Sequence, residues 1–404
     1  MQIKKSTRLD GVSYDIRGPV TTLALQMEQQ GEKIIKLNTG NPAAFGFTPF
    51  YESGFFEDKV QTTAAYSDSK GLLAAREAIA EYESSKGIQN IQIEHVFTGN
   101  GVSELISITL QALLDIGDEI LIPAPDYPLW TAAARLSGGK VVNYFCQEEN
   151  DWLPDMEDLA KKITLRTKAI VVISPNNPTG AVYPREILQE ICQIAERHNL
   201  LIFSDEIYDR LLMDDSKHIA IASLAPHLPI ITMNGLSKSH QLCGFRAGWM
   251  VISGDLSGAK DYLDALNVLV SMRLCANVNA QAIIPQALKQ PNFSQKELLP
   301  GGRLYEQREI TYTKLNEIDG VSVVKSKAGL YMFPKMDIAK FNITDDNQFV
   351  LDFLREKHVL LTHGRGYHWH TPDHFRMVYL PNVEELAEVM RRLRDFLAGY
   401  WQEV

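Results

Sequence analysis

The sequence predicts an α/β protein, with a large and mainly parallel sheet covered by helices and a second, smaller α+β domain. Three observations support this prediction. The chain has 404 residues, which exceeds the usual size of a single hydrophobic core. Two packed units are therefore expected. From about residue 90, short apolar runs alternate with amphipathic segments, which is typical of parallel strands buried on both faces. After about residue 300 this alternation gives way to shorter strands and a closing helix.

In chain order, the first expected element is a helix that begins at Pro19 and ends near Gly31. Proline is favoured at the first helical position and glycine just after the last. Buried strands are expected at the apolar runs Glu119 to Ile122, Ala169 to Ile173, Leu200 to Phe203, Ile230 to Met233 and Trp249 to Ile252. Helices are expected between them, where apolar residues recur at helical spacing, as at Ile106, Leu110, Leu113 and Leu114 and at Leu188, Ile191 and Ile194.

The last quarter of the chain predicts the smaller domain. Gly329 to Phe333 and Val359 to Thr362 indicate strands. A closing helix is expected to carry one apolar face, formed by Leu386, Val389, Met390, Leu393 and Phe396. We therefore expect residues 46–295 to form the large domain and residues 296–404 the small one. Residues 1–45 are expected to contribute to the small domain and to contacts between subunits.

The composition excludes several classes of function. Hydrophobic residues are 45% and charged residues 22% of the chain, as in an ordinary globular protein. A net charge of −10 argues against a nucleic-acid partner, which needs clustered Lys and Arg. No apolar stretch approaches the roughly 20 residues of a membrane-spanning helix, and no secretory signal is recognisable. The 4 cysteines are scattered, which predicts neither a metal site nor disulfides and favours a cytoplasmic location.

Polar and aromatic side chains follow the predicted strands at the points where they end. Because ligands bind beyond the carboxyl ends of strands in open α/β sheets, these segments are expected to converge on one site. They are Thr98 to Ser103, Pro123 to Pro128, Ser174 to Gly180, Ser204 to Tyr208 and Asn234 to Lys238, with Gly244 to Arg246 a few residues later.

Taken singly, each of these features has an ordinary structural explanation. The glycine-rich turn before Ser103 could cradle a phosphate or simply form a capped tight turn. Asp205 could pair with a buried cation or cap a helix, and Lys238 alone would be a surface lysine. Together they suit one type of cofactor. A lysine amine forms a Schiff base with an aldehyde, and a carboxylate keeps a pyridine nitrogen protonated. An aromatic face supports the ring, while an arginine and backbone amides hold a phosphate.

Four motifs carry a resemblance to a known family, namely Asn-Asn-Pro-Thr-Gly at 176–180, Ser-Asp-Glu-Ile-Tyr at 204–208, Asn-Gly-Leu-Ser-Lys at 234–238 and Gly-Phe-Arg-Ala-Gly-Trp at 244–249. Over nearly its whole length the sequence resembles the fold-type-I, class I/II aminotransferases, and most of all their alanine (glutamate–pyruvate) branch. The resemblance implies the PLP-transferase fold with its seven-stranded type of sheet, pyridoxal 5′-phosphate bound in the large domain, and a homodimer with shared active sites. The implied reaction transfers an amino group between L-alanine and 2-oxoglutarate, giving pyruvate and L-glutamate.

The resemblance also implies roles for individual residues. Lys238 would form the Schiff base and move the substrate proton, Asp205 would pair with the pyridinium nitrogen, and Tyr208 would bond the ring hydroxyl oxygen. Tyr127 would stack on the ring. The implied phosphate contacts are Gly101, Val102, Ser103, Ser237, Arg246 and, from the neighbouring subunit, Tyr66. The implied substrate contacts are Gly40, Asn177, Arg376, Tyr14 and Arg17, of which Asn177 also reaches the ring hydroxyl.

Physical chemistry adds expectations about three of these residues, and the resemblance adds one about Arg376. A neighbouring cationic ring and partial burial are expected to lower the pKa of Lys238, and the same ring is expected to keep Asp205 ionised. Asn177-Pro178 is expected to be a cis bond that turns the asparagine side chain toward the ring. The resemblance implies that Arg376 grips the α-carboxylate of the substrate with a bidentate fork.

The distal carboxylate of glutamate needs a partner that alanine does not need. Arg17 and Tyr14 are the first candidates and Arg273 is the second, although each arginine could instead form a surface or interface salt bridge. Replacing Arg17 by alanine is expected to raise the KM for glutamate far more than the KM for alanine, as measured by steady-state kinetics. Equal effects on the two substrates would contradict the assignment.

Two stretches depart from the family pattern and leave the substrate open. Residues 239–243 read Ser-His-Gln-Leu-Cys, where relatives more often carry an aromatic residue and an arginine, and residues 363–367 read His-Gly-Arg-Gly-Tyr. His240 and His363 are expected to be pocket-wall or structural residues, whereas Arg365 could alter the pocket.

Three alternative functions follow. The first is a transaminase of the same group that acts on branched-chain, aromatic or aspartate substrates. The second is a C–S lyase on the same scaffold, which the signature from Tyr14 to Pro19 disfavours. The third is a ligand-sensing regulator, which the presence of Lys238 and the lack of a basic DNA-binding segment disfavour.

Overall fold

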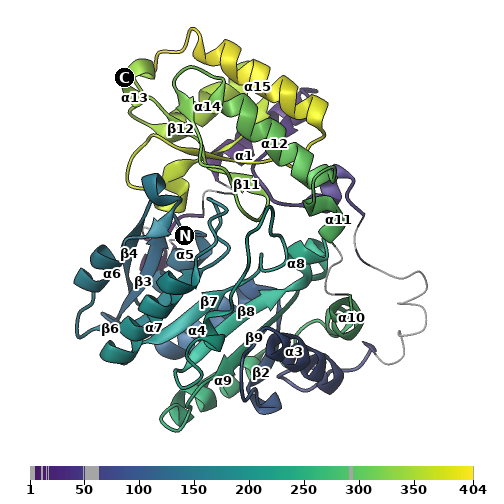
Figure 1. Ribbon diagram of the computed structural model, residues 1–404, viewed down its shortest axis with the longest axis vertical. Helices are drawn as coiled ribbons and strands as arrows, with labels where there is room; N and C mark the ends of the chain where they lie inside the picture. The colour runs from purple at the N-terminus through teal and green to yellow at the C-terminus, as the bar shows by residue number, and fades with distance from the viewer. Residues whose placement is uncertain are drawn as a thin grey trace, which may run out of the picture.

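The computed structural model describes residues 5–10, 12–14, 16, 18–48, 50, 63–290 and 294–403. Its largest feature is a sheet flanked by helices, with a smaller α+β unit at one end (Figure 1). Within the described residues this sheet has eight strands in the order β2-β9-β8-β7-β6-β3-β4-β5. Their bounds are β2 (Val96–Asn100), β3 (Glu119–Ala124), β4 (Lys140–Gln147), β5 (Leu153–Pro154), β6 (Thr167–Ile173), β7 (Leu201–Asp205), β8 (Ile230–Gly235) and β9 (Ala247–Ser253).

The directions of these strands confirm a mainly parallel sheet. The neighbours from β4 through β3, β6 and β7 to β8 all pair in parallel. By contrast, β9 runs antiparallel to both β8 and β2. At the other edge the two-residue β5 pairs antiparallel with β4. Apart from this short addition, the described sheet is of the seven-stranded type that the resemblance implied.

Helices cover both faces of the sheet, which explains why the strands read as continuous apolar runs. Along β6, Val171 and Ile173 pack into the core on one face, while Ile170 and Val172 pack into the core on the other. The helices of the first face are α4 (Val102–Leu113), α5 (Leu129–Leu136) and α9 (Lys260–Met272). Those of the second face are α3 (Leu73–Ser85), α6 (Met156–Lys161), α7 (Arg185–His198) and α10 (Val278–Leu288).

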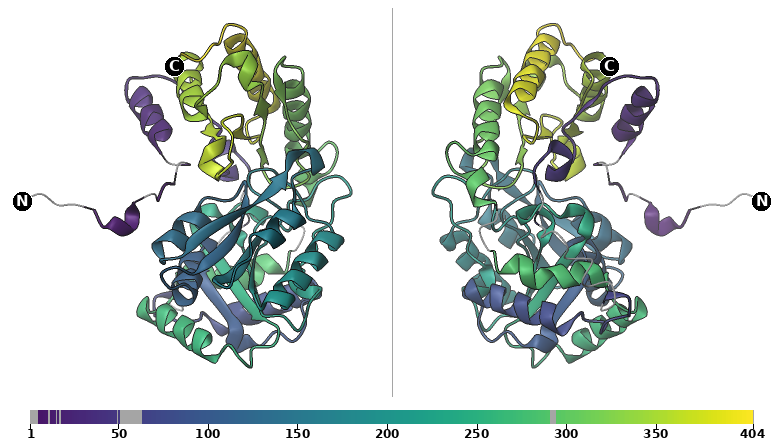
Figure 2. Two further views of the ribbon diagram at one scale, coloured as in Figure 1. Left: turned by 90° about the vertical axis from the view of Figure 1, so that its left-hand side faces the viewer. Right: turned by 90° about the vertical axis from the view of Figure 1, so that its right-hand side faces the viewer.

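The smaller unit brings together the two ends of the chain. Strand β1 (Ile35–Lys36) pairs in parallel with β13 (Val359–Leu360). Helix α1 (Pro19–Gln29) lies beside α14 (Asp346–Lys357) (Figure 2). One apolar core draws on both segments and includes Val20, Leu37, Phe353, Val378 and Leu393. The domain boundaries at residues 45 and 295 stay predictions.

Short elements complete the smaller unit. Its strands and helices are β10 (Val321–Ser322), β11 (Tyr331–Met332), β12 (Lys335–Met336), β14 (Thr362–His363), β15 (Phe375–Val378), α11 (Gln295–Leu298), α12 (Arg303–Asn316), α13 (Ile338–Phe341) and α15 (Val383–Leu397). The expected N-terminal helix is α1, which begins at Pro19 and ends just before Gly31, and the expected closing helix is α15, whose predicted apolar residues are all buried. The strand expected at 329–333 is shorter, as β11.

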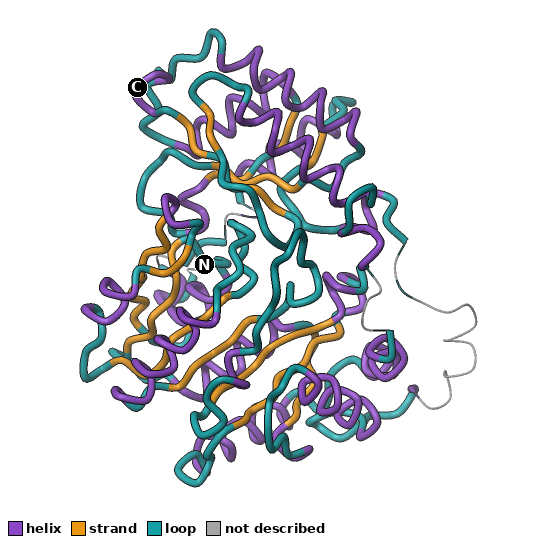
Figure 3. Tube along the Cα trace, viewed as in Figure 1, coloured by secondary structure: helices purple, strands orange, loops and turns teal. Residues whose placement is uncertain are grey.

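Loops and short helices complete the described chain. Loops at the ends of the sheet strands fill the region between the sheet and the smaller unit (Figure 3). The short helices are α8 (Leu236–Ser239), η1 (Thr7–Leu9), η3 (Pro42–Phe45), η4 (Ile93–His95), η5 (Glu148–Asn150), η6 (Ile221–Ser223), η7 (Cys243–Phe245) and η8 (Gly364–Tyr367). Across the part of the chain that the structure describes, no helix combines the length and apolarity needed to cross a membrane.

Candidate active site

A cavity of about 800 Å³ lies where the carboxyl ends of the sheet strands face the smaller unit. The walls come from three parts of the chain: the N-terminal segment, the strand ends, and the smaller unit. The residues singled out from the sequence that line it are Tyr14, Gly40, Val102, Ser103, Tyr127, Asn177, Asp205, Tyr208, Ser237, Lys238, Arg246 and Arg376. The expected convergence of the strand ends is therefore observed.

Lys238 projects into this cavity from α8, the short helix that directly follows β8. Its Nζ donates to the carbonyl oxygen of Gly40 over 2.6 Å and lies 3.8 Å from the Sγ of Cys243. Burial lowers the pKa of the Lys238 amine, but the Coulombic effect of Tyr331 and Cys243 outweighs burial and leaves the pKa above its usual value. The chain's own groups therefore do not produce the lower pKa of Lys238 that was expected from the sequence. That expectation relied on a cationic ring, which belongs to the cofactor.

Asp205 is the last residue of β7 and only 3% exposed. Its Oδ2 accepts from the indole Nε1 of Trp130 at 3.2 Å, and its Oδ1 accepts from the backbone N–H of Ile207 at 3.3 Å. Burial nevertheless raises the pKa of this carboxyl to about 6. A cation placed against the carboxylate would favour its charged form. Asp205 therefore suits a positively charged ring nitrogen.

The N-terminus of α4 forms an anion site together with Arg246. The Nη2 of Arg246 donates to the Oγ of Ser103 over 2.9 Å. Gly101, directly before the helix, has a φ of +79°, and a Cβ there would lie 2.2 Å from the same Nη2. The absence of a side chain at Gly101 therefore leaves room for the guanidinium beside the N-terminus of α4. A guanidinium beside a helix N-terminus suits a phosphate.

Arg376, on β15, is buried at 1% exposure and faces the other side of the cavity. Its Nη1 donates to the Oδ1 of Asn177 at 3.0 Å, and its Nη2 donates to the backbone oxygen of Asn38. The Nε is buried with no hydrogen-bond partner among the described residues. The guanidinium lies 4.3 Å from the ring centre of Tyr331 and 4.7 Å from that of Tyr367. A guanidinium that is fixed in this way and still has an N–H without a partner suits a carboxylate ligand.

Tyr331 was not anticipated as a site residue, although it lines the cavity. Its hydroxyl accepts from the hydroxyl of Tyr208 at 3.0 Å. A Cβ on Gly40 would lie 2.1 Å from the same oxygen, so the close approach of Gly40 depends on its having no side chain. The sequence offered only a strand signal at Tyr331, because its partners lie far away along the chain.

The cis peptide bonds and the contact between Tyr14 and Tyr127 bear on two expectations made from the sequence. The Asn177-Pro178 peptide bond is cis, as expected, and Ala124-Pro125 and Ser174-Pro175 are cis as well. The hydroxyls of Tyr14 and Tyr127 are 2.8 Å apart, which ties the N-terminal segment to the tyrosine expected to stack on the ring.

Two of the remaining sequence-predicted residues, Tyr66 and Arg273, are placed elsewhere. Arg17 lies outside the described residues. Tyr66 is 78% exposed and does not line the cavity. Arg273 also lies off the cavity: its guanidinium pairs with Glu104 and donates to the backbone oxygen of Thr98 at 2.7 Å. These contacts favour the salt-bridge alternative for Arg273.

Most residues of the two departures from the family pattern lie in the supporting structure, but Cys243 lines the cavity, with its Sγ 3.8 Å from the Nζ of Lys238. His240 is 0% exposed, and its Nε2 lies 2.9 Å from the backbone oxygen of Ala287. Burial lowers the pKa of its imidazole to about 4. The Nδ1 of His363 accepts from the backbone N–H of Gly366 at 3.1 Å. Arg365 bonds Asp346 at 2.7 Å and does not line the cavity, so it does not alter the pocket directly.

The family model for aminotransferase class I and II matches residues 32–393. The chain belongs to this family. It is 52% identical over 403 residues to the glutamate-pyruvate aminotransferase AlaA of Escherichia coli, with 99% of both chains covered. It is 50% identical over 402 residues to an alanine aminotransferase of Mycobacterium tuberculosis, covering 98% of this chain and 93% of the relative. A crystal structure of an aminotransferase from Escherichia coli matches with a TM-score of 0.97 and 51% identity over 100% of both chains.

The cofactor of this aminotransferase is pyridoxal 5′-phosphate, and the groups of the cavity fit it. The buried carboxylate of Asp205 suits the pyridinium nitrogen, and the start of α4 with Arg246 suits the phosphate. The amine of Lys238 lies in the same cavity and suits the aldehyde. No group of three or more His, Cys, Asp and Glu residues within the described ranges could hold a metal ion.

Proposed function

We propose that this aminotransferase transfers the amino group between L-alanine and 2-oxoglutarate, giving pyruvate and L-glutamate. The observation that carries the proposal is the 52% identity, over 99% of both chains, to a relative named for glutamate–pyruvate transfer. The groups of the cavity support it, since they include a cation for a carboxylate, a carboxylate for a ring cation, and a lysine amine. The roles below belong to the same proposal.

In the proposed mechanism Arg376 binds the α-carboxylate of the amino acid. Its contacts with Tyr331 and Asn177 would orient the fork in the cavity that also holds the Nζ of Lys238. Lys238 takes the Cα proton and holds it at Nζ as a general base. When bound, pyridoxal 5′-phosphate supplies an electron sink that makes the Cα proton acidic. Asp205 maintains the protonated ring nitrogen on which that acidity depends.

The remaining cavity residues are proposed to position the ligands. Tyr208 and Asn177 would bond the ring hydroxyl, and Tyr127 would support the ring face. Val102, Ser103, Ser237 and Arg246 would hold the phosphate, with Gly101 leaving room for the guanidinium. For the distal carboxylate of glutamate we retain Tyr14, whose hydroxyl meets that of Tyr127 in the cavity wall, and Arg17.

We also propose a homodimer in which Tyr66 reaches the phosphate of the neighbouring subunit. Its 78% exposure, away from its own cavity, supports a role toward a second chain. A cytoplasmic location is proposed from the cysteines Cys146, Cys192, Cys243 and Cys275, all of which are free.

Half-reaction kinetics with a panel of amino acids tests the substrates. Mixing the enzyme with L-alanine or L-glutamate should change the absorbance of the bound cofactor with a kcat/KM about 100-fold higher than for branched-chain, aromatic or aspartate substrates. Faster reaction with aspartate or a bulky amino acid would contradict the substrate assignment but not the family. Release of a thiol from a sulfur-containing amino acid would favour the lyase.

A further inference from the structure

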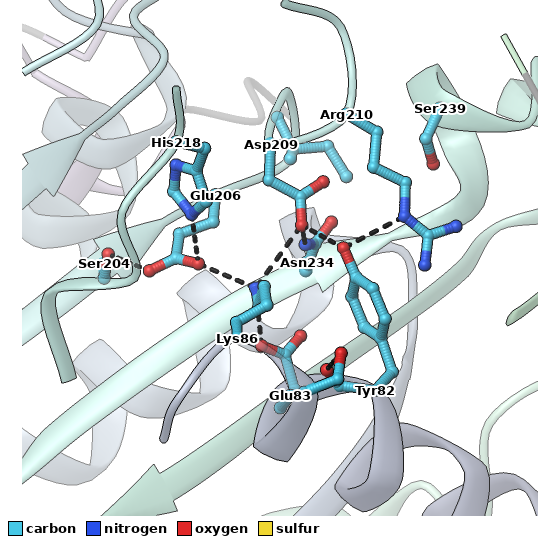
Figure 4. Close-up of polar contacts among 12 residues, drawn as sticks. Tyr82, Glu83, Lys86, Ser204, Glu206, Asp209, Arg210, His218, Asn234 and Ser239 are labelled. Carbon is cyan, nitrogen blue, oxygen red and sulfur yellow. Dashed lines mark hydrogen bonds and ion pairs between the residues drawn. The ribbon is translucent and has the colours of Figure 1, made fainter. Parts of the chain in front are cut away.

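A buried, charged cluster includes the residues that directly follow Asp205 and Tyr208, namely Glu206 and Asp209 (Figure 4). We call it the Lys86 cluster. Its members are Tyr82, Glu83, Lys86, Ser204, Glu206, Asp209, Arg210, His218, Asn234 and Ser239. No member lines the described wall of the cavity. The proposed mechanism therefore uses none of these charges directly.

Lys86 is the centre of the cluster. Its Nζ lies 2.5 Å from Glu83, 2.8 Å from Glu206 and 3.3 Å from Asp209. The side chain of Lys86 is 12% exposed, and those of Glu206 and Asp209 are 1% and 2% exposed. Lys86 also caps the C-terminus of α3, where the helix dipole favours a cation. One amine thus compensates several buried carboxylates that water cannot reach.

The charges on this amine and on Glu206 depend on each other. Burial lowers the pKa of Lys86, but the attraction of Glu206, Glu83 and Asp209 outweighs it and raises the pKa well above its usual value. Burial likewise raises the pKa of Glu206, but Lys86 and His218 outweigh that effect and bring it down to about 2. Both partners are therefore charged near neutral pH, and removal of either leaves a buried charge uncompensated.

The cluster holds the chain on both sides of Asp205 and Tyr208. Glu206 and Asp209 are the residues that directly follow these two, and both contact Lys86. The Oε1 of Glu206 also accepts from the Oγ of Ser204 at 2.9 Å. Asp205 and Tyr208 line the cavity while their neighbours point into the cluster. A displacement of Glu206 or Asp209 would therefore move the two cavity side chains.

The same cluster holds the chain on both sides of Lys238. Asp209 accepts from the Nδ2 of Asn234 at 2.7 Å, and the Oδ1 of Asn234 accepts from the backbone N–H of Gly235 at 2.7 Å. On the other side, the Oγ of Ser239 lies 2.9 Å from the Nδ1 of His240. The imidazole of His240 in turn lies 3.3 Å from Arg210.

Tyr82, on α3, completes the connection between these segments. Its hydroxyl donates to Asp209 and accepts from the Nε of Arg210 at 3.0 Å. The guanidinium of Arg210 also lies 4.0 Å from the centre of the Tyr82 ring. The end of α3 therefore contacts the segment that follows β7, and that segment in turn contacts the one that carries Lys238 through Asp209 and Arg210.

We propose that Lys86 is a positioning residue for transamination. Through its contacts with Glu206 and Asp209, it holds the side chains of Asp205, Tyr208 and Lys238 in their relative positions. The inference rests on the roles proposed above for Asp205 and Lys238. Its physical basis is that a buried carboxylate without its cation must move, take up a proton or admit water. A displacement of about 1 Å in an active site can cost about 100-fold in rate.

Three variants of the full-length holoenzyme test this inference. Lys86→Met removes the charge, Lys86→Arg retains it, and Tyr82→Phe removes one hydroxyl from the edge of the cluster. Lys86→Met is expected to lower kcat with L-alanine by about 10- to 100-fold while changing KM less than about threefold. Lys86→Arg should recover much of the loss, and Tyr82→Phe should show a smaller effect in the same direction.

A spectroscopic readout separates positioning from simple stabilisation. The absorbance of the bound cofactor titrates with pH as the lysine imine gains a proton. If Asp205 moves away from the ring nitrogen, the ring loses positive charge and the midpoint of this titration should rise by about half a pH unit or more. Fluorescence titration should also show weaker cofactor binding in Lys86→Met.

Arg308→Gln is the matched control. Arg308 is a buried cation at 0% side-chain exposure, and it pairs with Asp214 at 2.8 Å and Glu309 at 2.6 Å, away from the cavity. Its replacement should lower the melting temperature but leave kcat and the titration midpoint unchanged. If Lys86→Met and Tyr82→Phe both keep the wild-type midpoint, the positioning role is wrong and the cluster only stabilises the fold.

Two further outcomes separate a failure of this inference from a failure of the proposed function. If Lys86→Met does not fold, Tyr82→Phe decides the question, because Lys86→Arg is expected to stay near wild type. An unchanged midpoint and kcat in Tyr82→Phe then overturn the inference. If the wild-type enzyme lacks the titration, or if a Lys238→Ala variant retains it, the proposed role of Lys238 is wrong instead.

Discussion

Replacement of Lys238 by alanine is expected to lower the rate of amino transfer from L-alanine by about 10⁴-fold. The proposed role gives this amine both the imine with the cofactor and the movement of the Cα proton, and its Nζ lies in the cavity beside Gly40. Single-turnover absorbance measurements at saturating L-alanine, on protein loaded with pyridoxal 5′-phosphate, measure the loss. Retention of more than about 1% of the wild-type rate would contradict the assignment.

Stability provides the control for this variant. Lys238→Ala removes an amine whose contacts are the carbonyl oxygen of Gly40 and the thiol of Cys243. Loss of a partly buried cation with so few partners costs little folding free energy, so the melting temperature should stay within about 4 °C of wild type. A large fall in melting temperature would mean that the lost rate reflects misfolding.

Replacement of Arg376 by lysine is expected to lower kcat/KM by about 30- to 5,000-fold. This range corresponds to the 2–5 kcal/mol typical of truncating a buried, hydrogen-bonded charge pair. A lysine cannot reproduce the fork that is held by Asn177 and flanked by Tyr331. Since every amino-acid substrate has an α-carboxylate, L-alanine and L-glutamate should be affected alike. This distinguishes Arg376 from Arg17, for which only the glutamate KM should rise strongly.

Arg365→Lys is the matched control for Arg376→Lys. Arg365 also belongs to the smaller unit and forms ion pairs, here with Asp345 and Asp346, but it does not line the cavity. Its replacement should change kcat/KM by less than about threefold. If the two substitutions lowered kcat/KM equally, or if Arg376→Lys lowered kcat/KM for only one of the two substrates, the α-carboxylate assignment would be wrong.

Much of the sheet could be predicted because its strands are buried on both faces. The run at 169–173 lies entirely within β6, whose side chains enter the cores of both faces in alternation. Strand β4 was missed because it lies near the edge of the sheet and is only partly buried, so polar residues such as Asn143 interrupt its apolar pattern. The antiparallel direction of β9 was also not predicted, because strand direction depends on the path of the connection and not on composition.

The site was predicted where motifs follow the strands, and missed where distant segments meet. Asp205 and Lys238 stand at strand ends, which by itself places them at the binding edge of the sheet. Tyr331 contacts Tyr208 and packs closely on Gly40, residues more than a hundred positions away, and no local pattern marks such contacts. Lys86 reads locally as the end of an amphipathic helix, and its carboxylate partners are not all close to it in the chain.

The sequence by itself determined the order of most buried strands and of the helices between them, and which chemical groups stand at the ends of those strands. These features follow from hydrophobic periodicity and turn residues, which act over a few positions of the chain. Only the tertiary structure decided that Arg376 is held against Asn177 while Arg273 pairs with Glu104, and that one lysine serves the carboxylates behind Asp205. The reason is that burial and Coulombic attraction act through space, between groups that only the packed fold brings within a few ångströms.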